Sequence, residues 1–172
     1  MIFMVLASGG VAAPAPADDA CVDFKWDVSK ERVLYTGTPV ALTAGKGPKS
    51  APVVVPNRLY ELRLMSQEHV AFAVPPTKKM TDATAYGGLA TLKIPVPGSY
   101  RVAIDLPVWI DVVSNGTRVA AEDFQAQHGC SSPHKIVEFN LVGGGGSFVL
   151  QLSNARNENV LLTVTRSPPR KL

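Results

Sequence analysis

The sequence predicts an all-β protein: an antiparallel β-sandwich, jelly-roll-like in organisation, with about nine strands and little helix. Three observations lead to this prediction. Short segments in which apolar and polar residues alternate recur about every 8–12 residues. Glycine and proline, with 14 residues each, provide the turns between these segments. The sequence contains no helical heptad and no glycine-rich phosphate-binding loop between a strand and a helix.

The first part of the chain predicts three strands and one short helix. Two of the strands are indicated by alternating apolar and polar residues, and the third by a continuous apolar run stopped by two prolines. A serine begins the helical segment and is a typical N-cap. The predicted elements are a strand over residues 22–28, a helix over 29–34 capped by Ser29, a loop over 43–57, a strand over 59–65 and an interior strand over 70–74.

The remainder of the chain is more regular. A polar segment, residues 76–88, predicts a long surface loop. Asn115 and Gly116 predict a tight hairpin, because both residue types tolerate positive φ. The strands are predicted over residues 89–94, 100–105, 108–113, 118–122, 134–141, 148–152 and 160–164, with four glycines forming a turn at 143–146. The residues expected to face the core from the strand over 100–105 are Tyr100, Val102 and Ile104.

The N-terminal residues predict export. Residues 1–17 carry no charge and begin with a short apolar stretch. Ala15 and Ala17 are small residues at the two positions that signal peptidase reads, so we expect a signal peptide over 1–17. The alternative is a buried strand at the N-terminus. Cleavage leaves one β-sandwich domain over residues 18–172, periplasmic or secreted. The apolar stretch is too short for a bilayer of ~30 Å, and no transmembrane segment is expected in the mature chain.

Two cysteines, Cys21 and Cys130, predict a disulfide bond. In an exported protein an even pair of cysteines is usually bonded. The bond requires a Cα separation of roughly 4.4–6.8 Å. Two free buried thiols are the alternative for a chain that is not exported.

The charge pattern argues against nucleic acid as a partner. The net charge is +3, from 17 basic and 14 acidic residues. Nucleic-acid binding calls for a basic stripe with interleaved aromatic residues, and the sequence has no such stripe. The Gly-x-Ser-x-Gly elbow of many serine hydrolases is also missing from the sequence.

One set of residues is a candidate for binding a metal ion. His128 and His134 lie close together in the sequence, and Glu138 follows. Imidazole and carboxylate are ordinary ligands of transition metals. His134 and Glu138 share a face of the predicted strand but lie roughly 13 Å apart along it, so a shared ion requires a bend in the chain. The alternative is that both histidines are surface residues without a ligand role.

Binding residues are expected on loops or on one sheet face. Lys78 and Lys79 lie in the loop over residues 76–88 and are candidate binding residues. A second candidate is the loop over residues 124–134, which the predicted disulfide would hold at Cys130. Trp26 and Trp109 each have two interpretations: the side chain stacks on a sugar ring or an apolar ligand, or it belongs to the core.

Several segments carry a family resemblance. The sequence has a Pro-Gly-x-Tyr-x-Val turn that enters a strand, and a late strand of Val-Leu-Gln-Leu type. With these features it resembles bacterial pre-peptidase C-terminal-type domains and related carbohydrate-binding-like sandwiches. The resemblance covers about residues 60–166 and implies a sandwich fold with a non-catalytic, accessory role. The segments that carry it are residues 72–76, 88–95, 97–104 and 149–153.

The chain also resembles short exported proteins that are labelled homogentisate dioxygenase. That resemblance implies a non-haem iron enzyme with two histidine ligands and one glutamate ligand. The residues that match this ligand set are His128, His134 and Glu138.

Three functions follow from these patterns. We expect first an exported, non-catalytic binding or accessory module of the cell envelope, without a cofactor. Its partner would be an envelope protein or a glycan. The second is a small metal-dependent enzyme with iron as its cofactor, and the third is a structural subunit of an envelope complex.

Overall fold

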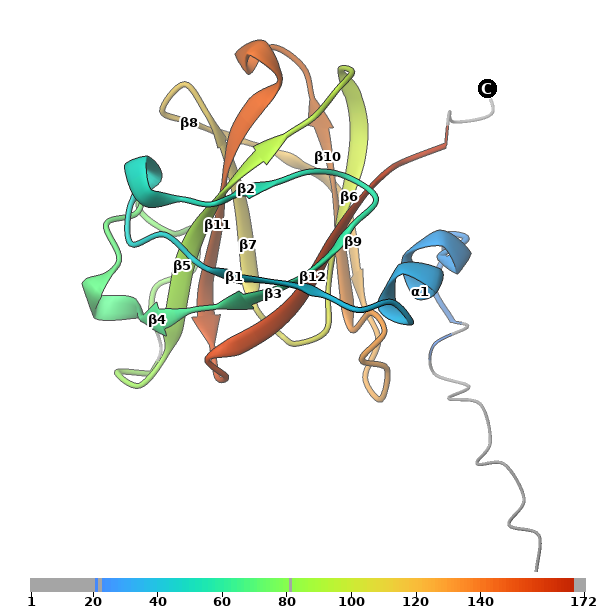
Figure 1. The fold of residues 1–172 in the computed structure, drawn as a ribbon, viewed down its shortest axis with the longest axis horizontal. Coiled ribbons are helices and arrows are strands. Elements are labelled where there is room, and N and C mark those ends of the chain that lie inside the picture. The colour runs from blue at the N-terminus through green and yellow to red at the C-terminus, as the bar shows by residue number, and fades with distance from the viewer. Residues whose placement is uncertain (1–20, 22, 81, 169–172) are drawn as a thin grey trace, which may run out of the picture.

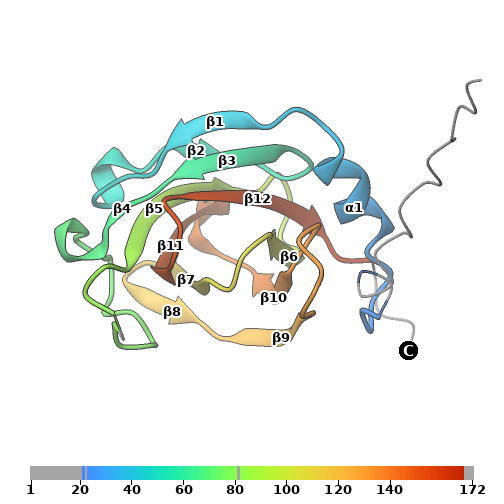
Figure 2. The same ribbon diagram turned by 90° about the horizontal axis from the view of Figure 1, so that it is seen from below.

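The computed structural model describes residues 21, 23–80 and 82–168 and shows a β-sandwich with one short α-helix (Figures 1 and 2). The predicted all-β sandwich is therefore confirmed. The described residues form twelve strands rather than about nine. Residues 40–43 and 53–54 form short strands where none was predicted, and the predicted strands over 59–65 and 118–122 are each divided in two. The predicted signal peptide, residues 1–17, lies outside the described residues.

Two mixed sheets, called here sheet A and sheet B, form the layers of the sandwich. All neighbouring strands are antiparallel except the pairs β1–β3 and β2–β5, which are parallel. Sheet A has the order β1 (Val40–Thr43), β3 (Leu59–Arg63), β12 (Asn159–Arg166), β6 (Gly98–Ile104), β10 (Lys135–Leu141), β9 (Ala121–Ala126). Sheet B has the order β2 (Val53–Val54), β5 (Tyr86–Lys93), β11 (Ser147–Ala155), β7 (Trp109–Ser114), β8 (Thr117–Val119), and β4 (Met65–Ser66) pairs with β5. The helical elements are α1 (Ser29–Tyr35) and the 3₁₀ turns η2 (Pro48–Ser50), η3 (Gln67–His69) and η4 (Gly144–Gly146).

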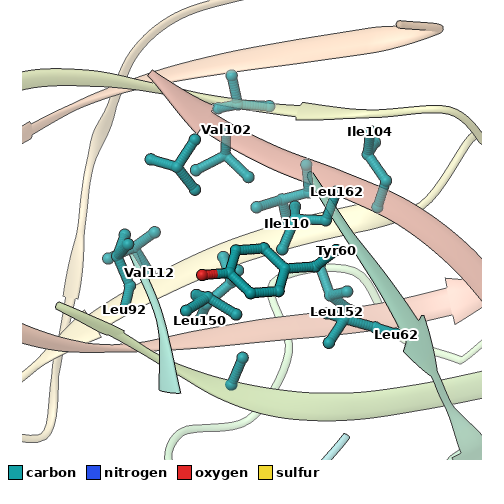
Figure 3. Close-up of a cluster of buried hydrophobic side chains, with 14 of the residues drawn as sticks. Tyr60, Leu62, Leu92, Val102, Ile104, Ile110, Val112, Leu150, Leu152 and Leu162 are labelled. Atoms are coloured by element: carbon teal, nitrogen blue, oxygen red, sulfur yellow. The ribbon is translucent and has the colours of Figure 1, made fainter. Parts of the chain in front are cut away.

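The main core lies between the two sheets, where apolar side chains from both inner faces interdigitate (Figure 3). The predicted inward residues of β6 are confirmed, since Tyr100, Val102 and Ile104 are at most 1% exposed. Leu150 and Leu152 of β11 face them from sheet B and are equally buried. Each fully buried aliphatic side chain of this kind stabilises the fold by roughly 1.5–3 kcal/mol before the entropy cost of ordering it.

The predicted hairpin is also confirmed. Asn115 and Gly116 have φ values of 49° and 75°, and they join β7 to β8 with Ser114 opposite Thr117. Positive φ at both turn residues matches the twist of the two flanking strands.

The predicted strand over residues 22–28 is wrong for its described residues, because residues 23–28 form no strand. This segment runs beside the edge strand β9, and its backbone pairs with side chains of β9 rather than with the β9 backbone. The side-chain amide of Gln125 donates to the carbonyl of Asp23 at 2.9 Å and accepts from the N–H of Lys25 at 2.8 Å. Hydrogen bonds from side-chain amides thus take the place of the strand-to-strand backbone hydrogen bonds that the alternation of apolar and polar residues would predict.

The helix that follows confirms the predicted element but not its cap. Helix α1 begins at Ser29, and Val28 occupies the cap position without a side-chain hydrogen bond. The N–H of Ser29 instead donates to a carboxylate oxygen of Asp27 at 2.9 Å. The prediction of Ser29 as N-cap is therefore wrong, and Asp27, two residues before Ser29, provides the side-chain acceptor.

The predicted interior strand over residues 70–74 is wrong as well. The segment is irregular and lies on the outer face of sheet B, where Gln151 of β11 acts as its partner. The N–H of Val74 donates to Gln151 Oε1 at 3.1 Å, and Gln151 Nε2 donates to the carbonyl of Val74 at 3.2 Å. The loop predicted over residues 43–57 also needs correction, because it contains η2 and the strand β2.

Candidate functional site

The outer face of sheet A is covered by the N-terminal segment of the described chain. The predicted disulfide is confirmed: Cys21 and Cys130 are bonded, with a Cα separation of 5.1 Å. The bond ties this segment to the loop between β9 and β10. The buried residues of the contact form a second, smaller apolar cluster, consisting of Cys21, Phe24, Val28, Ala103, Cys130 and Ile136.

A group of buried charged side chains lies next to this cluster on the same face. Arg101 of β6 is 6% exposed, Glu138 of β10 is 3% exposed and Glu31 of α1 is 1% exposed. Arg101 Nε donates to Glu138 Oε2 at 3.2 Å, and its Nη1 lies 3.9 Å from Glu31 Oε1. The same Nη1 donates to the carbonyl of Asp27 at 3.0 Å, and the hydroxyl of Thr165 donates to Glu31. Because a buried charge costs several kcal/mol unless it is paired, these contacts are what allow the three charges to be buried.

A pocket of about 670 Å³ opens above this group, and we call it the Arg101 pocket. Arg101 and Glu138 are among its lining residues although both are almost fully buried. The half-buried Trp26 also lines it, with the Arg101 guanidinium 5.0 Å from its ring centroid. The other residues that line the pocket are Ser99, Glu122, Arg166, Ser167 and Pro168.

Hydrogen bonds order the polar lining of the Arg101 pocket. The hydroxyl of Ser99 donates to Glu122 Oε2 at 3.0 Å, and the hydroxyl of Ser167 donates to Glu138 Oε2 at 2.7 Å. The lining therefore presents cationic donors, anionic acceptors, hydroxyl groups and an aromatic ring in one concave place. Such a mixture can orient a polar ligand through several hydrogen bonds at once.

The structure separates the three residues predicted to bind a metal ion. His128 and His134 are neighbours, with ring centroids 6.0 Å apart in an edge-on arrangement. The carboxylate of Glu138 lies instead in the charged group with Arg101 and Ser167. Within the part of the chain that the structure describes, no three His, Cys, Asp or Glu side chains are grouped closely enough to hold a metal ion.

The structure brings two of the three predicted binding residues together. Lys78 Nζ lies 6.0 Å from the centroid of the Trp109 ring, while Lys79 is exposed beside it. Lys135, which the sequence did not single out, lies over the same ring at 5.0 Å. Burial, and then the positive charge of Lys78, lower the pKa of Lys135. Trp109 itself is half-buried, on the face of β7 opposite to the core residue Ile110.

Of the residues that line the Arg101 pocket, sequence reasoning singled out only Glu138, as a metal ligand, and Trp26, as a stacking or core residue. The sequence carries no sign that Arg101 is buried, because Arg101 alternates with the apolar residues Tyr100 and Val102 as a solvent-facing strand residue does. Its burial comes from the N-terminal segment that covers this face. Nothing in the sequence indicated that Trp26 and Glu31 would supply this cover.

No protein-family model matches the sequence, and the search of curated proteins finds no significant match. The resemblances to pre-peptidase C-terminal-type domains and to proteins labelled homogentisate dioxygenase therefore stay predictions. Over the described residues, no helix has the length and apolar character needed to cross a membrane.

Proposed function

We propose that this chain is an exported, non-catalytic binding module of the cell envelope and that its ligand occupies the Arg101 pocket. The observation that carries the proposal is a pair of opposite charges, Arg101 and Glu138, which are more than nine-tenths buried and still line a pocket of about 670 Å³. This pocket volume falls within the usual range of small-ligand sites.

The lining favours a polar ligand with several hydroxyl groups, such as the sugar unit of a glycan. Guanidinium groups donate and carboxylates accept, so together they suit hydroxyl groups, which do both. Trp26 offers an aromatic ring at the pocket wall. The lining charges, from Arg101 and Arg166 against Glu122 and Glu138, are balanced, which favours a ligand without a large net charge.

The proposed compartment is supported by the disulfide. The bond between Cys21 and Cys130 is of a kind that persists in oxidising compartments such as the periplasm or the extracellular space. It also holds the segment that carries Trp26 against sheet A. In this proposal the pocket depends on export, because the disulfide that holds Trp26 in place forms in an oxidising compartment.

Tryptophan fluorescence tests the proposal directly. The chain has two tryptophans, so the Trp109→Phe variant leaves Trp26 as the only reporter, inside the pocket. Titration with a panel of soluble mono- and oligosaccharides should give a saturable change for at least one of them. If no sugar in the panel changes the Trp26 signal, the glycan assignment fails.

Pocket variants show where a bound sugar lies. Glu122→Gln and Arg166→Ala should each weaken binding about tenfold, because each removes a charge-assisted hydrogen bond. Arg63→Ala is the matched control, since Arg63 is an exposed arginine at a strand end that forms its ion pair with Glu158 outside the pocket. Equal weakening in all three variants would contradict binding in the Arg101 pocket. Elemental analysis of the same protein completes the test, because a stoichiometric transition metal would favour the metal-dependent enzyme instead.

A further inference from the structure

Two lysine side chains meet at the Trp109 ring from distant parts of the chain. Lys78 comes from the loop after η3, and Lys135 is the first residue of β10. Their ammonium nitrogens lie 6.0 Å and 5.0 Å from the ring centroid. Lys135 Nζ also donates to the carbonyl of Val108 at 3.0 Å, which fixes its position beside the ring.

Neither lysine forms an ion pair among the described residues, although the carboxylate of Asp111 is near enough to attract the charge of Lys135. Asp111 of β7 lies on the same strand face as Trp109, but its oxygens are already engaged. Thr77 donates to them through its hydroxyl at 2.7 Å and its N–H at 3.0 Å, and Arg118 Nε lies 3.2 Å from Oδ1. The surroundings of Trp109 therefore carry an excess of positive charge.

Two buried polar atoms on neighbouring residues of sheet B, one of them on Trp109 itself, lack a hydrogen-bond partner within the described chain. They are the indole nitrogen of Trp109 and the hydroxyl oxygen of Ser153. Ser153 of β11 and Trp109 of β7 are register partners, so their side chains are neighbours on one face of sheet B. A buried donor without an acceptor costs roughly 1–3 kcal/mol, which makes such a pair a place where an acceptor is expected.

We infer that Trp109, Ser153, Lys78 and Lys135 form a binding site for an oxyanion, that is, a phosphate, sulfate or carboxylate group. All four side chains can donate hydrogen bonds, and an oxyanion has several acceptor oxygens in a small volume. Ammonium groups form strong, charge-assisted bonds to such oxygens. This inference is independent of the Arg101 pocket, which is built from other residues and has balanced charges.

Phosphate titration followed by NMR tests the inference. The full chain, labelled with ¹⁵N, gives one indole N–H signal for each of its two tryptophans, and the Trp26→Phe variant assigns them. Sodium phosphate is added at constant ionic strength, with sodium chloride as the balancing salt. The Trp109 signal should shift and saturate, and the Trp26 signal should stay in place. A Trp109 shift that rises linearly without saturation would overturn the inference.

Three variants that each remove one positive charge distinguish specific phosphate binding at these side chains from nonspecific electrostatic attraction. Lys78→Gln and Lys135→Gln should each weaken phosphate binding about tenfold, the usual effect of losing one charge-assisted bond. Lys79→Gln is the matched control, because it removes the same charge from the neighbouring exposed residue and should change the affinity little. Lys78 is exposed, so its variant should fold even if the Lys135 variant does not. Equal effects of Lys78→Gln and Lys79→Gln would overturn the inference.

The same titration distinguishes a free anion from a substituent on a larger ligand. Methyl phosphate carries the oxyanion with one oxygen esterified. Binding of methyl phosphate as tightly as phosphate would assign the site to an esterified group. Binding of inorganic phosphate alone would assign it to a free anion.

Discussion

Arg101 and Glu138 face each other as register partners on β6 and β10, and their side chains form a buried ion pair at 3.2 Å. The pair lies on the outer face of sheet A, which in an open sandwich would meet water. Here the N-terminal segment covers it: Glu31 Oε1 of α1 lies 3.9 Å from Arg101 Nη1, and the Trp26 ring centroid lies 5.0 Å from the guanidinium. The ion pair therefore depends on a segment far away in the sequence.

Replacing Arg101 should destabilise the protein strongly. Arg101→Met leaves Glu138 and Glu31 buried without their cation, which costs about 3–5 kcal/mol. Urea unfolding followed by circular dichroism measures the change. Arg63→Met is the control, because it breaks an exposed ion pair with Glu158 and should cost less than about 1 kcal/mol. If the two variants lose similar amounts of unfolding free energy, the buried charges around Arg101 contribute little to stability.

Removing the disulfide should lower stability and loosen the N-terminal segment. The bond spans a sequence separation of 109 residues, for which the chain-entropy model gives about 4–5 kcal/mol as an upper estimate. The double variant Cys21→Ser, Cys130→Ser is compared with the oxidised protein by urea unfolding. Limited proteolysis should cut the variant first between residues 23 and 28. An unchanged unfolding midpoint would contradict this prediction.

The stability should decrease as the pH rises from about 4 to about 6. Burial raises the pKa of Asp105 from 3.8 to about 6, against the opposing effect of the Leu161 N–H that donates to it at 2.8 Å. Because the folded-state pKa is the higher one, the folded state binds the proton more tightly. The stabilisation that comes from this tighter proton binding at Asp105 is fully present below about pH 4 and is lost as the pH rises through about 6.

The variant Asp105→Asn isolates this effect. Its amide oxygen can still accept from the Leu161 N–H, but it has no charge to gain. The melting temperatures of the two proteins are measured from pH 4 to pH 7. They should be similar at low pH, and at high pH the variant should have the higher melting temperature. Parallel curves would show that Asp105 does not titrate differently in the folded state.

Replacing Gln151 should release the loop on the outer face of sheet B. Gln151 is 1% exposed and bonds both the N–H and the carbonyl of Val74. Gln151→Leu removes both bonds and should cost about 1–3 kcal/mol, because the Val74 groups lose their partners. Hydrogen exchange at the Val74 amide reports the release. Unchanged protection of that amide would contradict the proposed role of Gln151.

Export should leave a mature chain that begins at Asp18. This prediction depends on the uncharged leader and the small residues Ala15 and Ala17. Intact-mass measurement of the protein produced in a bacterial host with a working secretion system checks it. Recovery of a chain that still carries residues 1–17 would contradict the signal-peptide assignment.

The elements whose pattern is local can be predicted from the amino-acid sequence alone. Alternation in β6 identified Val102 and Ile104 as core residues, and Asn115-Gly116 identified the β7–β8 hairpin. These features depend on strand periodicity and on positive φ, which neighbouring residues decide. The cysteine count predicted the disulfide for a similar reason, since only one pairing of two cysteines exists within the chain.

The segments that cover the outer faces of the two sheets cannot be identified without the three-dimensional structure. Residues 23–28 and 70–74 have strand-like patterns, yet both are irregular segments held by glutamine side chains from the sheets they cover. The Arg101 pocket and the lysines around Trp109 likewise combine residues that are far apart in the chain. Periodicity shows which face of a strand is apolar, but it does not identify the distant segment that satisfies a buried polar group on the other face. That depends on long-range packing, because the partners of Arg101 and Gln151 lie on distant parts of the chain.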